Sequence, residues 1–309
     1  LVVAALVPLR WWRRLAFPLF LGTVLLLVAV QVVGLRRGGS ERWLSLGPVV
    51  LQPSEFAKPA TVLFLATLVS RKEDSMHRFR DFLWPVAISV GLVGGLVVVQ
   101  PDLGTTLLIA AGGFAVLVAS AAPLAYVLGG GVIGAAAAVA AAMISPYRWE
   151  RVISFLDVSA DPLDSGYQAM QSLVALGTGG LFGVGLGASR ARWSFLPNAH
   201  TDFIFSIVGE ETGLAGSLAV VLLFVMITAA GTLVALRCRD RFGRLVAIGI
   251  TTWLAAQALV NIGGVTGVLP ITGVPLPFVS YGGSALLTEL IGVGILVGIA
   301  RHTPKAETP

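Results

Sequence analysis

The sequence predicts an all-α protein, a polytopic transmembrane helical bundle, and three observations support this fold class. Of the 309 residues, 56% are hydrophobic and only 12% are charged. The mean hydropathy is +0.89, and soluble domains carry about 25% charged residues. The chain also contains eight apolar runs close to the roughly 20 residues that a membrane-spanning helix needs. Most of the chain must therefore face lipid or other apolar helices.

The expected elements follow in chain order. An apolar segment ends near Pro8, and we interpret it as the remainder of a helix in an N-terminally truncated chain. Eight full helices are expected near residues 15–34, 49–70, 82–99, 104–121, 126–144, 203–232, 245–267 and 282–300. Pro53 suits the first turn of the second helix, and Ser54 can help to cap it. Residues 146–202 form one large polar loop within a single membrane domain, residues 1–309.

The charge pattern orients these helices. If the loop with the first three arginines is cytoplasmic, alternation places thirteen basic residues on that side and seven on the other, as the positive-inside rule expects. The cytoplasmic set is Arg10, Arg13, Arg14, Arg71, Lys72, Arg78, Arg80, Arg237, Arg239, Arg241, Arg244, Arg301 and Lys305, and the opposite set is Arg36, Arg37, Arg42, Arg148, Arg151, Arg190 and Arg192. The large loop is therefore extracytoplasmic, away from cytosolic nucleotides.

Composition also excludes several classes of protein. The single cysteine, Cys238, rules out an internal disulfide framework, and the three histidines are too far apart for a metal-ligand motif. No GxxxxGK[ST] phosphate loop occurs. We assign the net charge of +5 to membrane topology and expect no nucleic-acid partner.

Two polar groups lie beside the early apolar runs. In PSEFAK, Glu55 and Lys58 are three positions apart, so they share a helix face and can pair. The pair either orients the helix at the interface or forms a charged patch beside lipid headgroups, with Lys58 available to phosphate. In QPDLGTT, Asp102 either caps the next helix or faces substrate together with Gln100 and Thr105.

The large loop contains an apolar, glycine-rich stretch, GTGGLFGVGLG. Its spacing resembles a dinucleotide fingerprint, but no β-α-β pattern surrounds it. We expect a re-entrant or interfacial segment, because irregular backbone at membrane depth needs protein or water against it. The loop arginines either bind phosphate or are simply solvated.

The triplet His200-Thr201-Asp202 ends this loop. Asp202 is either a cap at the positive end of a helix dipole or a functional acid, and His200 is either an interfacial histidine or part of a site. Acids within the apolar runs need a partner or a wet cavity, which makes them functional candidates: Glu210, Glu211 and Glu289.

Together these motifs resemble the SEDS family of bacterial membrane proteins (shape, elongation, division and sporulation). The matching pieces are RWLSLGPVVLQPSEFAK, QPDLGTTLL, GYQAMQSLVALGTGGLFGVGLG, LPNAHTDFIFSIVGEE, NIGGVTGVLPITGVPLPFVSYGGS and the final helix. HTDFIFSIVGEE and SYGGSALL are more similar to division members than to elongation members. Members normally have ten transmembrane helices, and here the first and most of the second are missing from the pattern.

The resemblance implies a peptidoglycan glycosyltransferase that polymerises lipid II at the outer face of the bacterial cytoplasmic membrane, for septal wall synthesis. It places the family's essential acid at Asp202, as the base or as a ligand of a divalent cation (Mg or Mn). Two acids that many division members have before this aspartate are replaced by Ser194 and Asn198. The implied substrate-binding residues are Arg42, Trp43, Glu55, Lys58, Gln100, Asp102, Gln171, Ser172, His200, Thr201 and Ser280.

The implied partners are lipid II, a lipid-linked glycan strand, a class B penicillin-binding protein with transpeptidase activity, and other division-complex membrane proteins. Two competing functions stay open. A lipid II flippase would also use intramembrane acids and broken helices. An intramembrane serine protease would use Ser280 or Ser284 with His200, although no GxSxG motif occurs.

Overall fold

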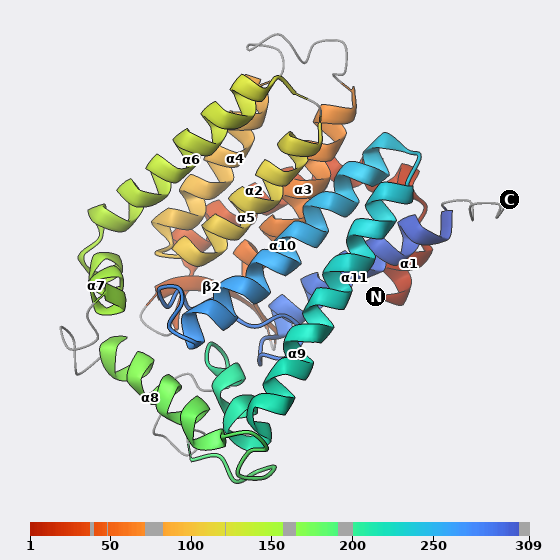
Figure 1. The fold of residues 1–309 in the computed structure, drawn as a ribbon. Helices are drawn as coiled ribbons and strands as arrows, with labels where there is room; N and C mark the ends of the chain where they lie inside the picture. Colours follow the sequence, from red (N-terminus) through yellow and green to blue (C-terminus); the bar gives the residue numbers. More distant parts are fainter. Residues whose placement is uncertain are drawn as a thin grey trace, which may run out of the picture. The chain divides into compact units, whose positions relative to one another are not determined.

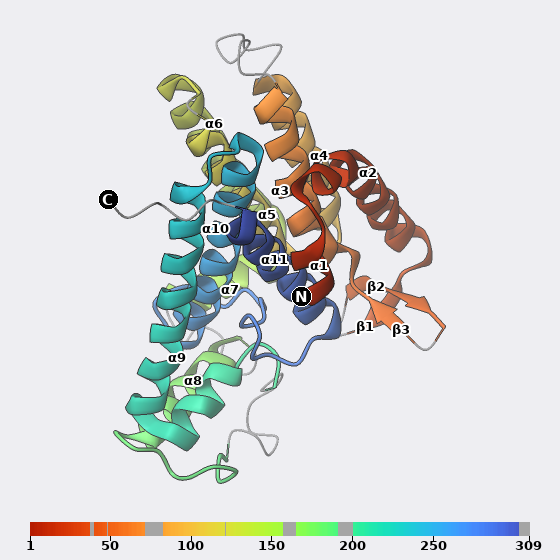
Figure 2. The same cartoon turned by 90° about the vertical axis from the view of Figure 1, so that its right-hand side faces the viewer.

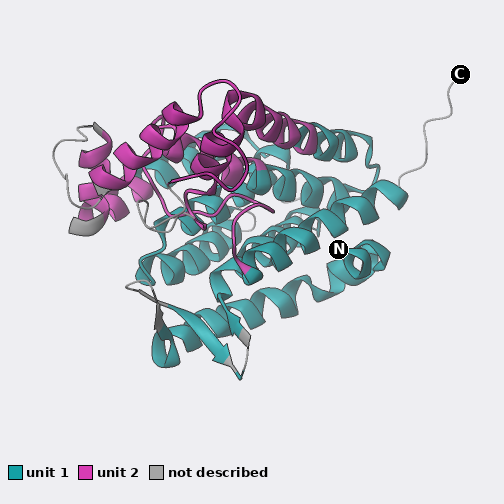
Figure 3. Ribbon diagram, turned by 90° about the horizontal axis from the view of Figure 1, so that it is seen from below, with its two compact units in different colours: residues 1–136, 228–254, 283–309 teal, residues 137–227, 255–282 magenta. Residues whose placement is uncertain are grey.

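The computed structural model describes residues 1–37, 40–47, 49–71, 83–120, 122–156, 165–190 and 200–302. The chain divides into two compact units, which we describe one at a time (Figure 3). Unit 1 comprises residues 1–136, 228–254 and 283–309, and unit 2 comprises residues 137–227 and 255–282.

Each of the eight expected apolar runs contains a helix (Figure 1). The helices are α1 (Val2–Leu6), α2 (Leu9–Val33), α3 (Pro53–Arg71), α4 (Trp84–Val99), α5 (Leu103–Ala119), α6 (Leu124–Ile144), α7 (Pro146–Leu156), α8 (Ser165–Gly179), α9 (Ile204–Arg237), α10 (Arg241–Val265) and α11 (Gly283–His302). Within the described residues, five of them are long and apolar enough to cross a membrane, namely α2, α6, α9, α10 and α11, and the apolar α4 and α5 are shorter. The chain is a multi-pass membrane protein, and the number of eight spans stays a prediction.

A small antiparallel sheet interrupts the all-α pattern in unit 1. It has the order β1 (Leu35–Arg37), β2 (Ser40–Leu46) and β3 (Val49–Leu51), and Figure 2 shows it after α2. Leu44 pairs with Leu51, so the residues expected to begin a helix at 49 instead complete a hairpin. The prediction failed here because a short apolar run does not distinguish a strand from the start of a helix. The expected proline start, at Pro53, is correct.

Unit 1 is built around α3, whose residues are nearly all buried. One apolar cluster joins it to α2, α4 and α5 through Phe20, Leu27, Ala57, Val93, Val97 and Ile109. Glycines allow α5 and α10 to approach it closely: a side chain at Gly112 would press on Val62, and so would one at Gly249. Small residues at such crossings are the usual means of close helix packing in membranes.

Unit 2 contains two helices that the sequence analysis treated as loop, α7 and α8. Its core joins α8, the start of α9, the end of α10 and the segment that follows α10, through Ala175, Phe203, Phe205, Ile207, Ala258, Val265 and Leu276. Helix α9 is not continuous, because Gly213 has φ 68° and ψ −164°. The triplet His200-Thr201-Asp202 forms a turn immediately before α9, beside this core.

Candidate functional site

The backbone of the His200-Thr201-Asp202 triplet is fixed at three successive carbonyls. The amide of Tyr281 donates to the carbonyl of His200 (3.0 Å), and the hydroxyl of Ser280 donates to that of Thr201 (2.5 Å). The side-chain amide of Asn261 donates to the carbonyl of Asp202 (2.8 Å). The triplet is therefore held by the end of α10 and by the segment after it, which leaves its side chains to interact elsewhere.

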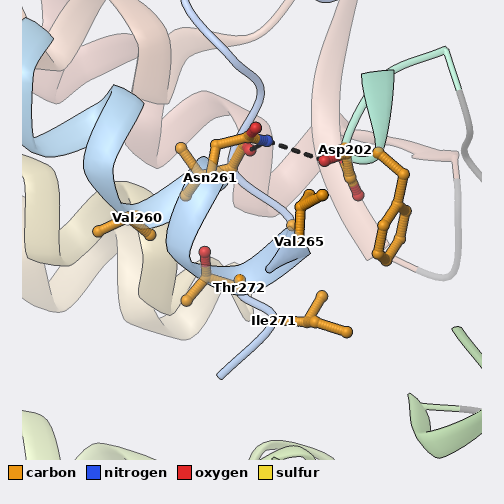
Figure 4. A pocket seen from close by; sticks show the side chains of 10 residues that line it. Asp202, Val260, Asn261, Val265, Ile271 and Thr272 are labelled. Carbon is orange, nitrogen blue, oxygen red and sulfur yellow. Dashed lines mark hydrogen bonds between the residues drawn. The ribbon is translucent and has the colours of Figure 1, made fainter. Parts of the chain in front are cut away.

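Asp202 lines a pocket in unit 2 together with Asn261, Ile271, Thr272, Gly273 and Val274 (Figure 4). Asn261 lies on the last turns of α10, and its amide nitrogen also donates to the carbonyl of Val274 (2.7 Å). Its oxygen Oδ1 is buried and accepts no hydrogen bond within the described chain. The pocket thus combines a carboxylate with an amide acceptor that a polar ligand can use.

Gly273 lies beside both the carboxylate of Asp202 and a cation. A β-carbon at Gly273 would lie 3.4 Å from Oδ2 of Asp202 and 3.7 Å from Nη1 of Arg151. Arg151 reaches this point from α7 and donates to the carbonyl of Ile271 (3.3 Å). Gly273 itself has φ +71°, a conformation that glycine adopts far more readily than other residues. A side chain at position 273 would therefore contact both the acid and the guanidinium group.

The other predicted residues of unit 2 have distinct positions. His200 is exposed, and its ring meets the edge of the Tyr281 ring at 6.2 Å. The hydroxyl of Ser280 makes two hydrogen bonds, because it donates to the carbonyl of Thr201 and also accepts from the amide of Leu276 (2.7 Å). This arrangement gives no support to the form of the protease interpretation in which His200 activates Ser280.

Two further predicted residues lie on α8. Ser172 is fully buried, and its hydroxyl donates to the carbonyl of Val265 (2.7 Å) and lies 2.8 Å from the hydroxyl of Ser206. In this conformation Ser172 joins α8 to the ends of α9 and α10, so its observed contacts are structural. Gln171 is half-buried on the same helix.

In unit 1, Arg42, Gln100 and Asp102 form one polar cluster. Arg42, on β2, donates to the carbonyls of Gln100 (2.8 Å) and Pro101 (2.5 Å), and its Nη1 lies 3.7 Å from Asp102. Asp102 also accepts from the amide of Thr105 (3.1 Å). Asp102 is therefore a helix cap, one of its two expected roles, and in addition it faces a cation. Gln100 is buried and donates to the carbonyl of Leu27 (3.0 Å).

Glu55 and Lys58 form the expected ion pair, with 2.7 Å between Nζ of Lys58 and Oε2 of Glu55. Their side chains are only 2% and 1% exposed, and Nζ of Lys58 lies 5.2 Å from the centre of the Trp253 ring. We expected this pair at a surface or interface, and the structure buries it instead, because α3 is enclosed by its neighbours. Trp43 is half-buried on β2. The family resemblance also implies one outward-facing cavity for this pair, Arg42, Trp43 and Asp202. Because Asp202 belongs to the other unit, that cavity stays a prediction.

Of the three acids predicted inside the apolar runs, Glu210 and Glu289 are buried. Glu210 is buried and accepts from the hydroxyl of Ser189 (2.5 Å) and from the amide of Arg190 (3.2 Å). These donors replace the water that a carboxylate at this depth lacks. Glu210 therefore fastens the end of the glycine-rich loop to α9. Glu289 is buried on α11 in unit 1.

Sequence reasoning missed Asn261 as a member of the Asp202 pocket, the position of Arg151 beside that pocket, and Gly273 as a further member. The only signal was that the first and last lie in the quoted motif NIGGVTGVLPITGV. The described residues bring together no group of three acids, histidines or cysteines that could hold a metal ion. Arg192, Ser194 and Asn198 lie outside the described residues.

The family model that covers FtsW, RodA and SpoVE, described as a cell cycle protein, matches residues 1–305. The chain belongs to the FtsW/RodA/SpoVE family. The chain is 38% identical to a probable peptidoglycan glycosyltransferase FtsW of Geobacter sp. (strain M18), over 96% of this chain and 82% of that protein. It is 40% identical to the stage V sporulation protein E of Bacillus subtilis, over 95% and 80%.

Solved structures of the FtsW/RodA/SpoVE family share this fold. A chain of a peptidoglycan synthase complex, solved in a study of how polymerization and crosslinking are coordinated, has a TM-score of 0.80 and 33% identity, covering 98% of this chain and 85% of that one. The rod-shape-determining protein RodA of Thermus thermophilus has a TM-score of 0.71 and 29% identity, covering 98% and 83%.

Proposed function

We propose that this chain is a peptidoglycan glycosyltransferase that polymerises lipid II into glycan strands at the outer face of the cytoplasmic membrane. The class of enzyme is that of its FtsW relatives, over nearly the whole chain. The single observation that supports Asp202 as the reactive group is its place in a pocket, on a turn whose three carbonyls are fixed. Such fixation is what a catalytic group needs to stay in position.

In the proposed reaction, the C4 hydroxyl of an acceptor sugar attacks the anomeric carbon of a lipid-linked donor. The new C–O bond forms as the bond from the anomeric carbon to the diphosphate breaks, and undecaprenyl diphosphate leaves. Asp202 takes the proton of the attacking hydroxyl, a contribution of about 10²–10⁴-fold to the rate. Asn261 lines the same pocket, and its Oδ1, which accepts no hydrogen bond within the described chain, would accept one from a second hydroxyl of the sugar.

The leaving diphosphate needs positive charge close to the reacting carbon. Among the loop arginines that the structure describes, Arg151 contacts two residues that line the Asp202 pocket, Ile271 and Gly273. We assign this role to Arg151, since a guanidinium group matches phosphate oxygens in a fixed geometry. Lys58 and Arg42, in unit 1, are further candidates. A divalent cation would supply the same charge when bound, with Asp202 as one ligand, and none of the steps above depends on it.

Gly273→Ala is expected to lower the polymerisation rate at least tenfold, because its β-carbon would occupy space in contact with both Oδ2 of Asp202 (3.4 Å) and Nη1 of Arg151 (3.7 Å), where the substrate must bind. Gly267→Ala is the matched control: Gly267 has φ +73°, close to the +71° of Gly273, and its β-carbon would meet only Leu173 at ordinary contact distance. Both variants carry the same backbone strain, about 1–2 kcal/mol. Equal rates for the two variants, measured with fluorescent lipid II, would contradict the role given to this space.

Proteoliposomes distinguish this function from a lipid II flippase. The chain would be reconstituted with its cognate class B penicillin-binding protein, inactivated in the transpeptidase site, and with fluorescent lipid II. Glycan strands resolved on a gel are expected for a polymerase. Lipid II that becomes accessible on the opposite side of the vesicle, without any strand forming, would instead identify a flippase and reject the proposal.

We also propose a septal role and a class B penicillin-binding protein as partner. The FtsW names of the curated relatives favour division. The similarity to a chain of a peptidoglycan synthase complex favours a partner that crosslinks the strands. The polymerase and the crosslinking enzyme would then act on the same growing strand.

A further inference from the structure

The loop between α8 and the Ser189–Glu210 contact exposes an unusual amount of apolar surface. Phe182 and Leu186 are each 84% exposed and Leu181 is 65% exposed, and Val184 is also exposed. We call these four side chains the apolar crest. They lie within nine residues that include four glycines with positive φ, at 180, 183, 185 and 187. A loop in water would not normally present such residues.

The backbone of this loop completes the broken helix α9. In a continuous helix the amides of Leu214 and Ala215 would bond to the carbonyls of Glu210 and Glu211. Here those amides instead bond to the carbonyls of Gly180 (2.9 Å) and Leu181 (3.2 Å).

The two carbonyls that the break releases are also paired with the loop. The carbonyl of Glu210 accepts from the amide of Val184 (2.9 Å), and that of Glu211 accepts from the amide of Gly185 (3.1 Å). Four hydrogen bonds between the loop and α9 thus replace the two helical hydrogen bonds that the break removes. These four loop groups are therefore paired within the protein, as irregular backbone near a membrane requires.

The length of α9 fixes the depth of the break. Its longer part, Leu214–Arg237, rises about 36 Å at 1.5 Å per residue. The hydrocarbon core of a bilayer is about 30 Å thick. With Arg237 at one headgroup region, the break and the loop lie at the opposite boundary of the membrane, the level at which aromatic side chains are enriched.

We infer that the apolar crest inserts into the bilayer at this boundary and anchors the extracytoplasmic loop to the lipid. The occupant is the lipid rather than a protein, because the loop that carries the crest is bonded to the break in α9, a helix apolar and long enough to span a membrane. Leu214, Leu218 and Leu222 of α9, which follow the break, are all exposed on an apolar helix long enough to span. The anchor fixes the loop segment that leads to Asp202, and it does not depend on the chemistry of Asp202.

Site-directed spin labelling tests this anchor. The full chain, with Cys238→Ser, would be placed in nanodiscs of phosphatidylethanolamine and phosphatidylglycerol and labelled at Phe182→Cys or Leu186→Cys. Leu222→Cys is the control for lipid depth, and Arg190→Cys, an exposed charged position at the end of the same loop, is the control for water. Collisions with oxygen and with a water-soluble nickel chelate are measured at each site.

The crest labels are expected to collide with oxygen at least threefold more often than the Arg190 label does, and with nickel at most a third as often. Nickel collisions equal to those at Arg190 would place the crest in water, and exclusion of both reagents would place it against protein; either result overturns the inference. A photoreactive phospholipid offers the same test without any substitution. On the wild-type chain its adducts are expected within residues 181–186, and adducts on α9 without any there would reject the anchor.

Discussion

Gly183→Ala is expected to destabilise the protein far more than Gly187→Ala does. Both glycines have φ +80°, so alanine at either position carries the same backbone strain of about 1–2 kcal/mol. A β-carbon at Gly183 would overlap the carbonyl of Glu211, whereas nothing lies within 4 Å of one at Gly187. Because backbone cannot move aside as a flexible side chain can, the overlap must separate the loop from α9.

We expect Gly183→Ala to lose more than about 4 kcal/mol of unfolding free energy, the range reached by few single substitutions. Thermal unfolding in detergent, followed by intrinsic fluorescence, measures the difference. A second pair of glycines, Gly177 and Gly179, lies at helical positions of α8, so alanine at either adds no strain from a positive φ. Gly179→Ala would overlap the carbonyl of Gly209, and Gly177→Ala meets nothing within 4 Å. Equal melting temperatures within either pair would contradict the contact between the loop and α9.

The helical framework could be predicted from the sequence because apolar runs of membrane length carry a strong signal. Each expected run contains a helix, and Pro53 marks the start of α3. The sheet after α2 could not, because strands of three residues such as Val49–Leu51 are too short to show a period. The break in α9 was also hidden. Gly213 lies inside the expected helical run 203–232, and only the neighbouring loop makes its conformation favourable.

The candidate site was predicted only in part. The quoted motifs identified Asp202 and Ser280. In the structure the Ser280 hydroxyl donates to the carbonyl of Thr201, the residue before Asp202. Asn261 was not identified, and Arg151 was named only as one of the loop arginines that could bind phosphate, since their contacts join residues 59 and 120 positions apart. No local pattern encodes such contacts. The buried position of Lys58 was missed for the same reason, because the ring beside it belongs to Trp253 on a distant helix.

Asp202→Asn is expected to lower the rate of lipid II polymerisation by about 10²–10⁴-fold, the contribution of a positioned general base. Asparagine keeps the size of the side chain and removes its basicity. The contacts that fix the turn involve the backbone carbonyls of residues 200–202, so the substitution leaves them in place. The melting temperature is therefore expected to stay within a few degrees of that of the wild type.

Asp240→Asn is a suitable control for loss of an acid. Asp240 pairs with Arg13 at 2.9 Å and accepts from the amide of Gly243, in a half-exposed position of unit 1. We expect at most a modest loss of stability, since exposed ion pairs contribute about 0–1 kcal/mol, and an unchanged rate. If the control loses as much activity as Asp202→Asn, charge removal in general, and not the pocket, is responsible.

The most direct measurement of the central claim is the single-turnover formation of one glycosidic bond, with lipid II binding measured in the same sample. Wild type and Asp202→Asn would be compared with the cognate partner present. The account predicts binding within about threefold and a bond-forming rate at least 100-fold lower for the variant, because the carboxylate acts in the chemical step. A variant that forms the bond at the rate of the wild type would contradict it.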